Sequence, residues 1–359
     1  MKSCEKCGRP IADPAAACPY CGYSQAAELP NALQPGWEIA GRYRIESVIG
    51  LGGFGITYCA YDQKLACTVA LKEYFPSGVA NRIPGSKEVI LYAGKRTEEF
   101  RQGYTRFLNE ARNMIQFQSV PNVVQVREYF EENGTAYIVM EYLRGHTLKT
   151  EIERAPLTWE RAVTIGAVIC GALTALHRKG IVHRDVSPDN IFLCDDGRIK
   201  LIDFGAVRTK TLQHQGLVQI TPGYTPPEFY PGRRSEIGPW CDMYELGATF
   251  YELLTGQVPH PADQRSVVDR NPKVTSYAAL RKTYPMNFLS GIDKALSPDE
   301  RSRFHSAKAW NDYINAMAAA GTLQAGGVAR KALPKARKKS SAGTAFVIIL
   351  LIAAAAVWI

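Results

Sequence analysis

The stretch His183-Arg-Asp-Val-Ser-Pro-Asp-Asn190 decides the fold of this chain, together with Asp203-Phe-Gly205. Working outward, Gly50-Leu-Gly-Gly-Phe-Gly55 and Val69-Ala-Leu-Lys72 precede it, and Pro226-Pro-Glu228 follows it. A glycine loop alone is a weak signal, because dinucleotide sites also use one. Five motifs in this order are a specific signal. The series predicts a site that handles phosphate and magnesium.

The glycine motif is expected to cover phosphate groups. Gly50, Gly52 and Gly55 lie between two strands predicted within residues 43–60, so bare backbone can fold closely over a phosphate chain. A dinucleotide-binding turn would lead into a helix instead. The strand-like pattern after Gly55 argues against that alternative.

Lys72 ends an apolar run in a strand predicted over residues 68–73, which points its ammonium group toward the phosphates. A lysine held there needs a carboxylate to fix its direction. Glu110 is the best candidate because it lies in the middle of a helix predicted over residues 97–117. Glu98 and Glu99 remain alternatives.

Three polar residues are expected to do the chemistry. Asp185 can accept or orient the proton of an acceptor hydroxyl, whereas Asn190 and Asp203 can hold magnesium through oxygen atoms. Each residue alone would be an ordinary turn or surface residue. Their joint spacing is what predicts the roles.

These motifs resemble those of the eukaryotic-like serine/threonine protein kinases of bacteria, across residues 37–319. The resemblance implies an α+β fold with a small β-rich lobe and a large helical lobe. It also implies transfer of the γ-phosphate of ATP, with Mg²⁺ or Mn²⁺, to serine or threonine hydroxyls of protein substrates. The implied catalytic residues are Asp185, Lys72, Glu110 and Asn190. The implied ATP-binding residues are Gly50, Leu51, Gly52, Gly53, Phe54, Gly55, Thr57, Ala70, Lys72, Met140, Glu141 and Leu143.

The same resemblance implies structural and regulatory positions. Met140 is similar to a gatekeeper, and residues 141–143 are similar to the hinge that binds adenine. Arg184 is similar to an arginine that binds a phosphorylated activation segment, with Thr209 and Thr211 as the nearest acceptors. Dimerisation for autophosphorylation is left open. The remaining positions are His183 and Asp242 as structural residues, Thr221 in the substrate-binding loop, and Glu228 paired with Arg303, or alternatively Arg301.

Ser187 departs from the family pattern, which has a lysine two residues after the catalytic aspartate. Serine offers one neutral hydrogen bond and cannot replace a positive charge on the γ-phosphate. Two alternatives follow: an active kinase, slowed or helped by another cation, or a nucleotide-binding pseudokinase that acts as a scaffold. The intact set of metal ligands and base favours the active kinase.

A second departure is the long gap between Lys72 and Glu110. Residues 74–106, which contain several prolines and glycines, are expected to form a loop or hairpin inserted before the helix of Glu110. Such an insertion could couple a partner to the position of that helix. A passive surface loop is an equal alternative.

The N-terminal residues 1–24 are expected to form a zinc ribbon. Cys4, Cys7, Cys18 and Cys21 form two CxxC pairs, each followed by glycine, which suits one tetrahedral zinc ion. The other five cysteines are scattered, as is typical of a reducing cytosol. Residues 25–36 then form a linker.

The C-terminal residues 343–359 are apolar and uncharged, near the lower length limit for crossing a bilayer. The basic linker 320–342 before them predicts a single-pass membrane anchor with the kinase in the cytoplasm. Most of the net charge of +9 belongs to this linker, which disfavours nucleic acid as a partner. Between these ends, strands are expected over 123–130 and 136–142, and helices over 159–179, 244–254 and 310–319.

Overall fold

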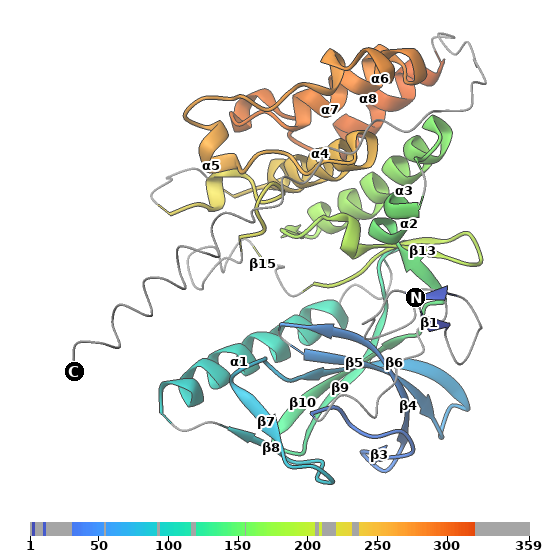
Figure 1. Cartoon of the computed structure of the whole chain (residues 1–359), viewed down its shortest axis with the longest axis vertical. Coiled ribbons are helices and arrows are strands. Elements are labelled where there is room, and N and C mark those ends of the chain that lie inside the picture. The colour runs from blue at the N-terminus through green and yellow to red at the C-terminus, as the bar shows by residue number, and fades with distance from the viewer. Residues whose placement is uncertain are drawn as a thin grey trace, which may run out of the picture. The chain divides into compact units, whose positions relative to one another are not determined.

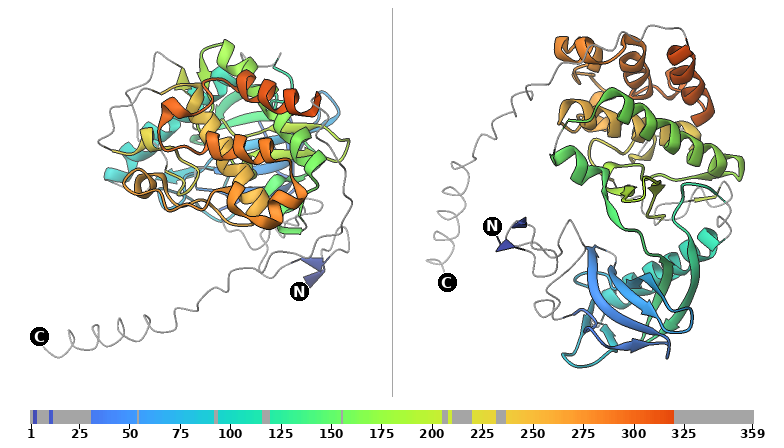
Figure 2. Two further views of the ribbon diagram at one scale, coloured as in Figure 1. Left: turned by 90° about the horizontal axis from the view of Figure 1, so that it is seen from above. Right: turned by 90° about the vertical axis from the view of Figure 1, so that its right-hand side faces the viewer.

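The computed structural model describes residues 2–3, 10–11, 31–53, 55–91, 94–115, 120–154, 156–204, 208–209, 220–231 and 237–319. Within this part of the chain, a β-rich lobe and a helical lobe follow one another in sequence (Figures 1 and 2). The α+β, two-lobed arrangement expected from the sequence is therefore present.

The small lobe is built on a six-stranded antiparallel sheet in the order β3-β4-β5-β6-β10-β9. Its strands are β3 (Glu38–Ile39), β4 (Tyr43–Gly52), β5 (Gly55–Asp62), β6 (Cys67–Tyr74), β9 (Val126–Glu132) and β10 (Thr135–Glu141). Apolar side chains alternate into its core, where Tyr43, Tyr58 and Tyr137 are fully buried. Helix α1 (Lys95–Ile115) contacts β9 and β10 (Figure 1).

The inserted segment is shorter than the sequence predicted. Strands β7 (Ala80–Arg82) and β8 (Val89–Leu91) pair as an antiparallel hairpin, so a hairpin is present. However, residues 95–106 belong to α1, and Tyr74 belongs to β6, so the bounds 74–106 were wrong. The loop predicted over 74–106 overlapped the helix predicted over 97–117, and the structure agrees with the helix for residues 97–106.

The large lobe is mainly helical. Its helices are α2 (Leu148–Arg154), α3 (Trp159–Arg178), α4 (Pro239–Thr255), α5 (Ala262–Arg265), α6 (Ala278–Thr283), α7 (Met286–Ala295) and α8 (Ala307–Ala319). Its strands are β11 (Gly145–Thr147), β13 (Ile191–Cys194) and β14 (Ile199–Leu201) in one sheet, and β12 (Ile181–Val182) paired with β15 (Arg208–Thr209).

Helices α3 and α4 form the centre of this lobe. Thr158 caps α3 by accepting a hydrogen bond from the backbone of Arg161, and Gly180 adopts a positive φ of 75° just after the helix. By length and composition, α3 is the one described helix that could cross a membrane, but its apolar face packs into the core. Helix α4 is buried from Cys241 to Thr255, and its side chains bind the backbone of residues 183–190, here named the catalytic stretch because it contains the expected catalytic residue Asp185.

Candidate active site

Lys72 lies in the middle of the small-lobe sheet. Strand pairing puts Lys72 beside Thr57 of β5, and Thr57 beside Gly50 of β4. The Lys72 Nζ donates to Glu110 Oε1 at 3.4 Å and to Asp203 Oδ1 at 3.1 Å. The structure thus brings the lysine of the small lobe to one carboxylate on α1 and one from the large lobe.

The two alternatives to Glu110 lie elsewhere. Glu98 and Glu99 are exposed near the start of α1, and Glu98 accepts a hydrogen bond from Gln102. Burial alone would lower the pKa of Lys72, but the charges of Asp203 and Glu110 outweigh it and raise the pKa. Burial raises the pKa of Glu110. With all three groups ionised, the two carboxylates exceed the one ammonium by one negative charge, which favours binding of a further cation.

The glycine motif forms the turn between β4 and β5. A side chain at Gly55 would place its Cβ 2.1 Å from the carbonyl oxygen of Glu73, so only glycine fits there. Around Gly53 nothing lies within 4 Å of such a Cβ, so this side of the turn is open. Phe54 lies outside the described residues. The tight packing at one end and the open space at the other suit a loop that covers a ligand.

The residues expected to contact adenine lie on adjacent strands. Ala70 is buried and pairs with Met140 across β6 and β10. The side chain of Glu141 is turned away, because its Oε1 accepts from Lys200 Nζ at 2.5 Å and from the backbone of Gln125 at 2.9 Å. Only the backbone of Glu141 is therefore suited to bind a base.

Asp185 is held by Asn190. The Asn190 Nδ2 donates to the Asp185 carbonyl at 2.9 Å and to its Oδ2 at 2.8 Å. Burial, and then the charge of Asp203, raise the pKa of Asp185 to about 6. A carboxyl with this pKa can take up and release a proton near neutral pH.

Helix α4 holds the catalytic stretch through hydrogen bonds to its backbone. Asp242 accepts from the backbone of His183 at 3.0 Å and of Arg184 at 2.9 Å, and Arg184 has a positive φ of 68°. His183 is fully buried, and burial lowers its pKa to about 4, so it stays neutral. Its ring packs edge-on against Phe204 at 4.6 Å between centroids. His183 thus begins the stretch, and Asp242 binds the backbone of its first two residues.

Two further residues of α4 hold Val186, the neighbour of Asp185, and the sequence analysis missed both. Glu245 accepts from the Val186 N–H at 2.8 Å, and Thr249 donates to the Val186 carbonyl at 3.1 Å. Burial raises the pKa of Glu245 well above its usual value. Residues 242, 245 and 249 share one helix face, but only the folded structure shows that this face meets Val186.

Ser187 is almost fully buried, at 6% exposure, and its carbonyl accepts from the Asn190 N–H at 3.0 Å. It begins a short 3₁₀ turn over Pro188–Asn190. The backbone carbonyl of Ser187 therefore supports Asn190, the expected magnesium ligand, and the serine side chain supplies no charge.

Downstream, Glu228 pairs with Arg303 through two hydrogen bonds of 2.6 and 3.0 Å, and both side chains are buried. The alternative partner, Arg301, is exposed. The Thr221 N–H donates to Thr225 Oγ1 at 2.8 Å. The contact expected for Glu228 is thus made with Arg303, and Thr221 lies in an internally bonded turn.

Several predicted residues lie outside the described part: Cys4, Cys7, Cys18, Cys21, Gly205 and Thr211, the side chain of Thr209, and residues 320–359. Within the described part, no group of three or more His, Cys, Asp or Glu side chains could hold a metal ion. Magnesium bound to a nucleotide needs only few protein oxygens. Asp203, whose side chain is 44% exposed, together with Asn190 fits that need.

Comparison with known proteins gives one family. The protein kinase domain family matches residues 43–313. A solved structure titled "PpkA-294 apo form" superposes with a TM-score of 0.70 at 32% identity, covering 79% of this chain and 99% of that one.

Curated relatives agree with this match. Serine/threonine-protein kinase PrkC of Bacillus subtilis is 32% identical over 280 residues, which cover 76% of this chain and 40% of the relative. A probable serine/threonine-protein kinase of Clostridium perfringens is 31% identical over 277 residues, 75% of this chain and 37% of the relative. Serine/threonine-protein kinase PknL of Mycobacterium tuberculosis is 35% identical over 226 residues, 62% of this chain and 51% of the relative. The chain thus spans about half or less of their length.

Proposed function

The chain belongs to the protein kinase family, and from this we propose that it transfers the γ-phosphate of ATP to serine or threonine hydroxyls of proteins. The observation that carries the proposal is the bridge from Lys72 to Glu110 and Asp203, beside an Asp185 held by Asn190. A scaffold without catalysis would not need this arrangement. The pseudokinase alternative is therefore not favoured.

The residues divide the work as follows. Lys72 would neutralise phosphate oxygens, with its direction fixed by Glu110. Because the Asn190 nitrogen donates to Asp185, the oxygen of the same amide is left to bind Mg²⁺ together with Asp203. ATP with its magnesium supplies the phosphoryl group and the cation.

Asp185 would receive the proton of the acceptor hydroxyl. Its raised pKa, near 6, and its fixed orientation suit that role. Along the chain, Thr221 and the turn after it lie between residues 183–190 and Glu228, and by family resemblance this segment would dock a peptide. A kinase-like enzyme for small molecules would not need such a segment.

Phosphate transfer is tested with the full chain in detergent, labelled ATP, Mg²⁺ and a generic protein acceptor. We expect incorporation by the parent and loss of at least about 10²-fold in Asp185→Asn, which removes the base. Ser187→Lys should raise kcat, because it adds the missing charge. Nucleotide binding without any incorporation by the parent would leave only the scaffold function.

We also propose that the chain carries a zinc ribbon over residues 1–24. Strands β1 (Lys2–Ser3) and β2 (Pro10–Ile11), which flank Cys4 and Cys7, pair antiparallel, and this supports a turn that presents thiolates. Metal analysis of the purified chain should find one zinc ion, lost in Cys4→Ser. A zinc-free parent would refute the ribbon.

Membrane anchoring by residues 343–359 and the domain bounds 1–24, 25–36, 37–319, 320–342 and 343–359 are proposals of the same kind. Their support is the uncharged apolar terminus behind a basic linker. Ending the chain at residue 342 should move it from the membrane fraction to the supernatant. Equal distribution of both forms would contradict the anchor.

A further inference from the structure

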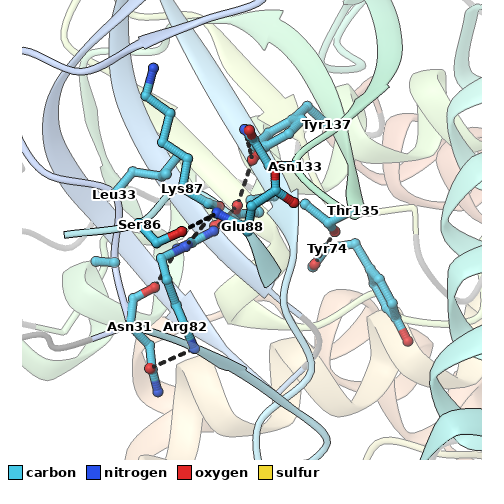
Figure 3. A network of polar contacts seen from close by, with 12 residues as sticks. Asn31, Leu33, Tyr74, Arg82, Ser86, Lys87, Glu88, Asn133, Thr135 and Tyr137 are labelled. Carbon is cyan, nitrogen blue, oxygen red and sulfur yellow. Dashed lines mark hydrogen bonds and ion pairs between the residues drawn. The ribbon is translucent and has the colours of Figure 1, made fainter. Parts of the chain in front are cut away.

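The β7–β8 hairpin, which lies between β6 and α1 in the sequence, forms a buried ion pair with β6, the strand that contains Lys72. Arg82, on β7, forms an ion pair with Glu73, on β6, and the two side chains are 1% and 0% exposed. Glu73 also accepts from Tyr58 Oη at 2.8 Å and from Tyr137 Oη at 2.7 Å. Figure 3 shows the side chains of Arg82 and Tyr137 directed toward the same part of this network.

The same arginine binds two other parts of the chain. Its Nε donates to the carbonyl of Lys87 at 3.1 Å, which closes the hairpin. Its Nη1 donates to the carbonyl of Asn31, and its N–H donates to Asn31 Oδ1 at 3.3 Å (Figure 3). The backbone of Leu33 in turn donates to Tyr58 Oη at 3.1 Å. The segment that follows the N-terminal cysteines is thus fastened to the same ion pair.

The ion pair between Arg82 and Glu73 lies on the face of β6 opposite to the side chain of Lys72. Glu73 follows Lys72 in β6, so the two side chains leave opposite faces of one strand. Holding the Glu73 carboxylate from one side therefore fixes the position and tilt of Lys72 on the other. The strand passes between β5 and β10, which carry the two tyrosines that also bind Glu73.

The next residue, Tyr74, connects the strand to α1. Its Oη donates to the carbonyl of Phe100 at 3.2 Å, and its ring lies 5.0 Å from Phe100 and 5.4 Å from Phe107. Both phenylalanines are on the helix that carries Glu110. Three consecutive residues of β6 thus have three roles: Lys72 faces the nucleotide site, Glu73 forms the buried ion pair, and Tyr74 contacts α1.

A passive surface loop does not need a buried charge. Removing either partner of a buried pair leaves the other charge uncompensated in the core, so the pair is either complete or strongly disrupted. Because the two partners lie on the hairpin and on the lysine strand, the hairpin and the strand must be ordered together.

We propose that Arg82 is a positioning residue for Lys72 and Glu110. In this proposal, residues 31–33 and the β7–β8 hairpin together form one regulatory element beside the nucleotide site. Movement of the N-terminal segment then changes nucleotide affinity through Arg82. The proposal rests on the proposed ATP-dependent function, but its test does not require phosphate transfer.

The test measures MgATP affinity by calorimetry and hydrogen exchange by mass spectrometry on the full chain. Arg82→Met should weaken MgATP binding at least about tenfold and speed exchange in residues 31–33, β6 and α1. Exchange in α4 and α8 should stay as in the parent. Arg44→Met, at an exposed arginine of the same lobe, is the matched control and should change affinity less than about twofold.

A double variant separates positioning from plain stability. Glu73→Gln with Arg82→Met removes both charges, so no uncompensated charge stays in the core, and the glutamine oxygen can still accept from the two tyrosine hydroxyls. We expect this variant to melt close to the parent temperature but to keep the weakened MgATP binding. The proposal fails if a double variant that melts like the parent also binds MgATP like the parent, or if exchange rises equally in both lobes. If the parent itself binds no MgATP, the proposed function fails, and exchange alone decides this proposal.

Discussion

At the scale of single residues, the candidate site depends on groups whose protonation is shifted by burial. Asp185, His183 and Glu245 all lie in or under the catalytic stretch, and each favours its neutral form more than it would in water. A kinase that lacks the usual lysine at position 187 has little positive charge there to offset this effect. The pH dependence of the site is therefore its most direct signature.

Activity should fall at mildly acidic pH because Asp185 must be ionised to accept a proton. With its pKa raised to about 6 by burial, kcat/KM should drop about tenfold for each pH unit below that value. A profile of kcat/KM against pH between pH 5 and 8 measures this acidic decrease. A decrease near pH 4 instead would mean that the carboxyl is not shifted when substrates are bound.

Glu245→Gln should stabilise the protein at neutral pH and leave it unchanged in acid. In the folded parent, the pKa of Glu245 lies above the usual 4.5, so as pH rises this carboxyl ionises first in the unfolded chain. The free energy of unfolding of the parent therefore decreases from about pH 4.5 upward. Glutamine does not ionise and can still accept the Val186 N–H. Thermal unfolding of both forms at pH 4 and pH 8 tests the difference. A constant gap at the two pH values would contradict it.

At the scale of elements, the sequence predicted what periodicity and motif chemistry specify. The strands around the glycine motif, the Lys72 strand, α3 and the helix of Glu110 were predicted close to their observed bounds. The short helices α2, α5, α6 and α7 were not, because four to ten residues carry too little periodicity to separate a helix from a loop. The clamp of Glu245 and Thr249 on Val186 was missed because a tertiary contact, and no local motif, creates it.

Helix α1 approaches β6 closely enough that Gly103 has a steric role. A Cβ there would lie 2.0 Å from Tyr74 Oη, so Gly103→Ala should push the helix away although alanine favours a helix by about 1 kcal/mol. We expect a net loss of about 1–2 kcal/mol and weaker MgATP binding. Chemical unfolding and calorimetry measure the two effects.

Tyr74→Phe supplies the control for this element. It removes the hydroxyl that an alanine at 103 would strike, so the double variant should recover part of the lost stability and affinity. The ring carbon Cζ at 3.0 Å still limits the recovery. Additive losses in the double variant would show that the contact is not the cause.

At the scale of the whole molecule, the segment that follows Thr221 is tied to the C-terminal part of the large lobe by the buried ion pair between Glu228 and Arg303. Arg303→Met would leave the Glu228 carboxylate buried without its cation, which costs about 3–5 kcal/mol. Arg301→Met, at an exposed arginine two residues earlier, should stay within about 0.5 kcal/mol of the parent. Urea unfolding followed by tryptophan fluorescence compares them, and equal losses would show that the pair contributes little.

The segment before β4 has a practical consequence for anyone who produces this protein. Leu33 and Ile39 are fully buried, and β3 pairs with β4, yet the family match begins only at residue 43. A recombinant fragment trimmed to that boundary would lose these side chains and expose the apolar residues they cover. Such a fragment should precipitate during expression, whereas one that begins at residue 31 keeps its lobe sealed and is the sensible starting point for crystals and inhibitor screens.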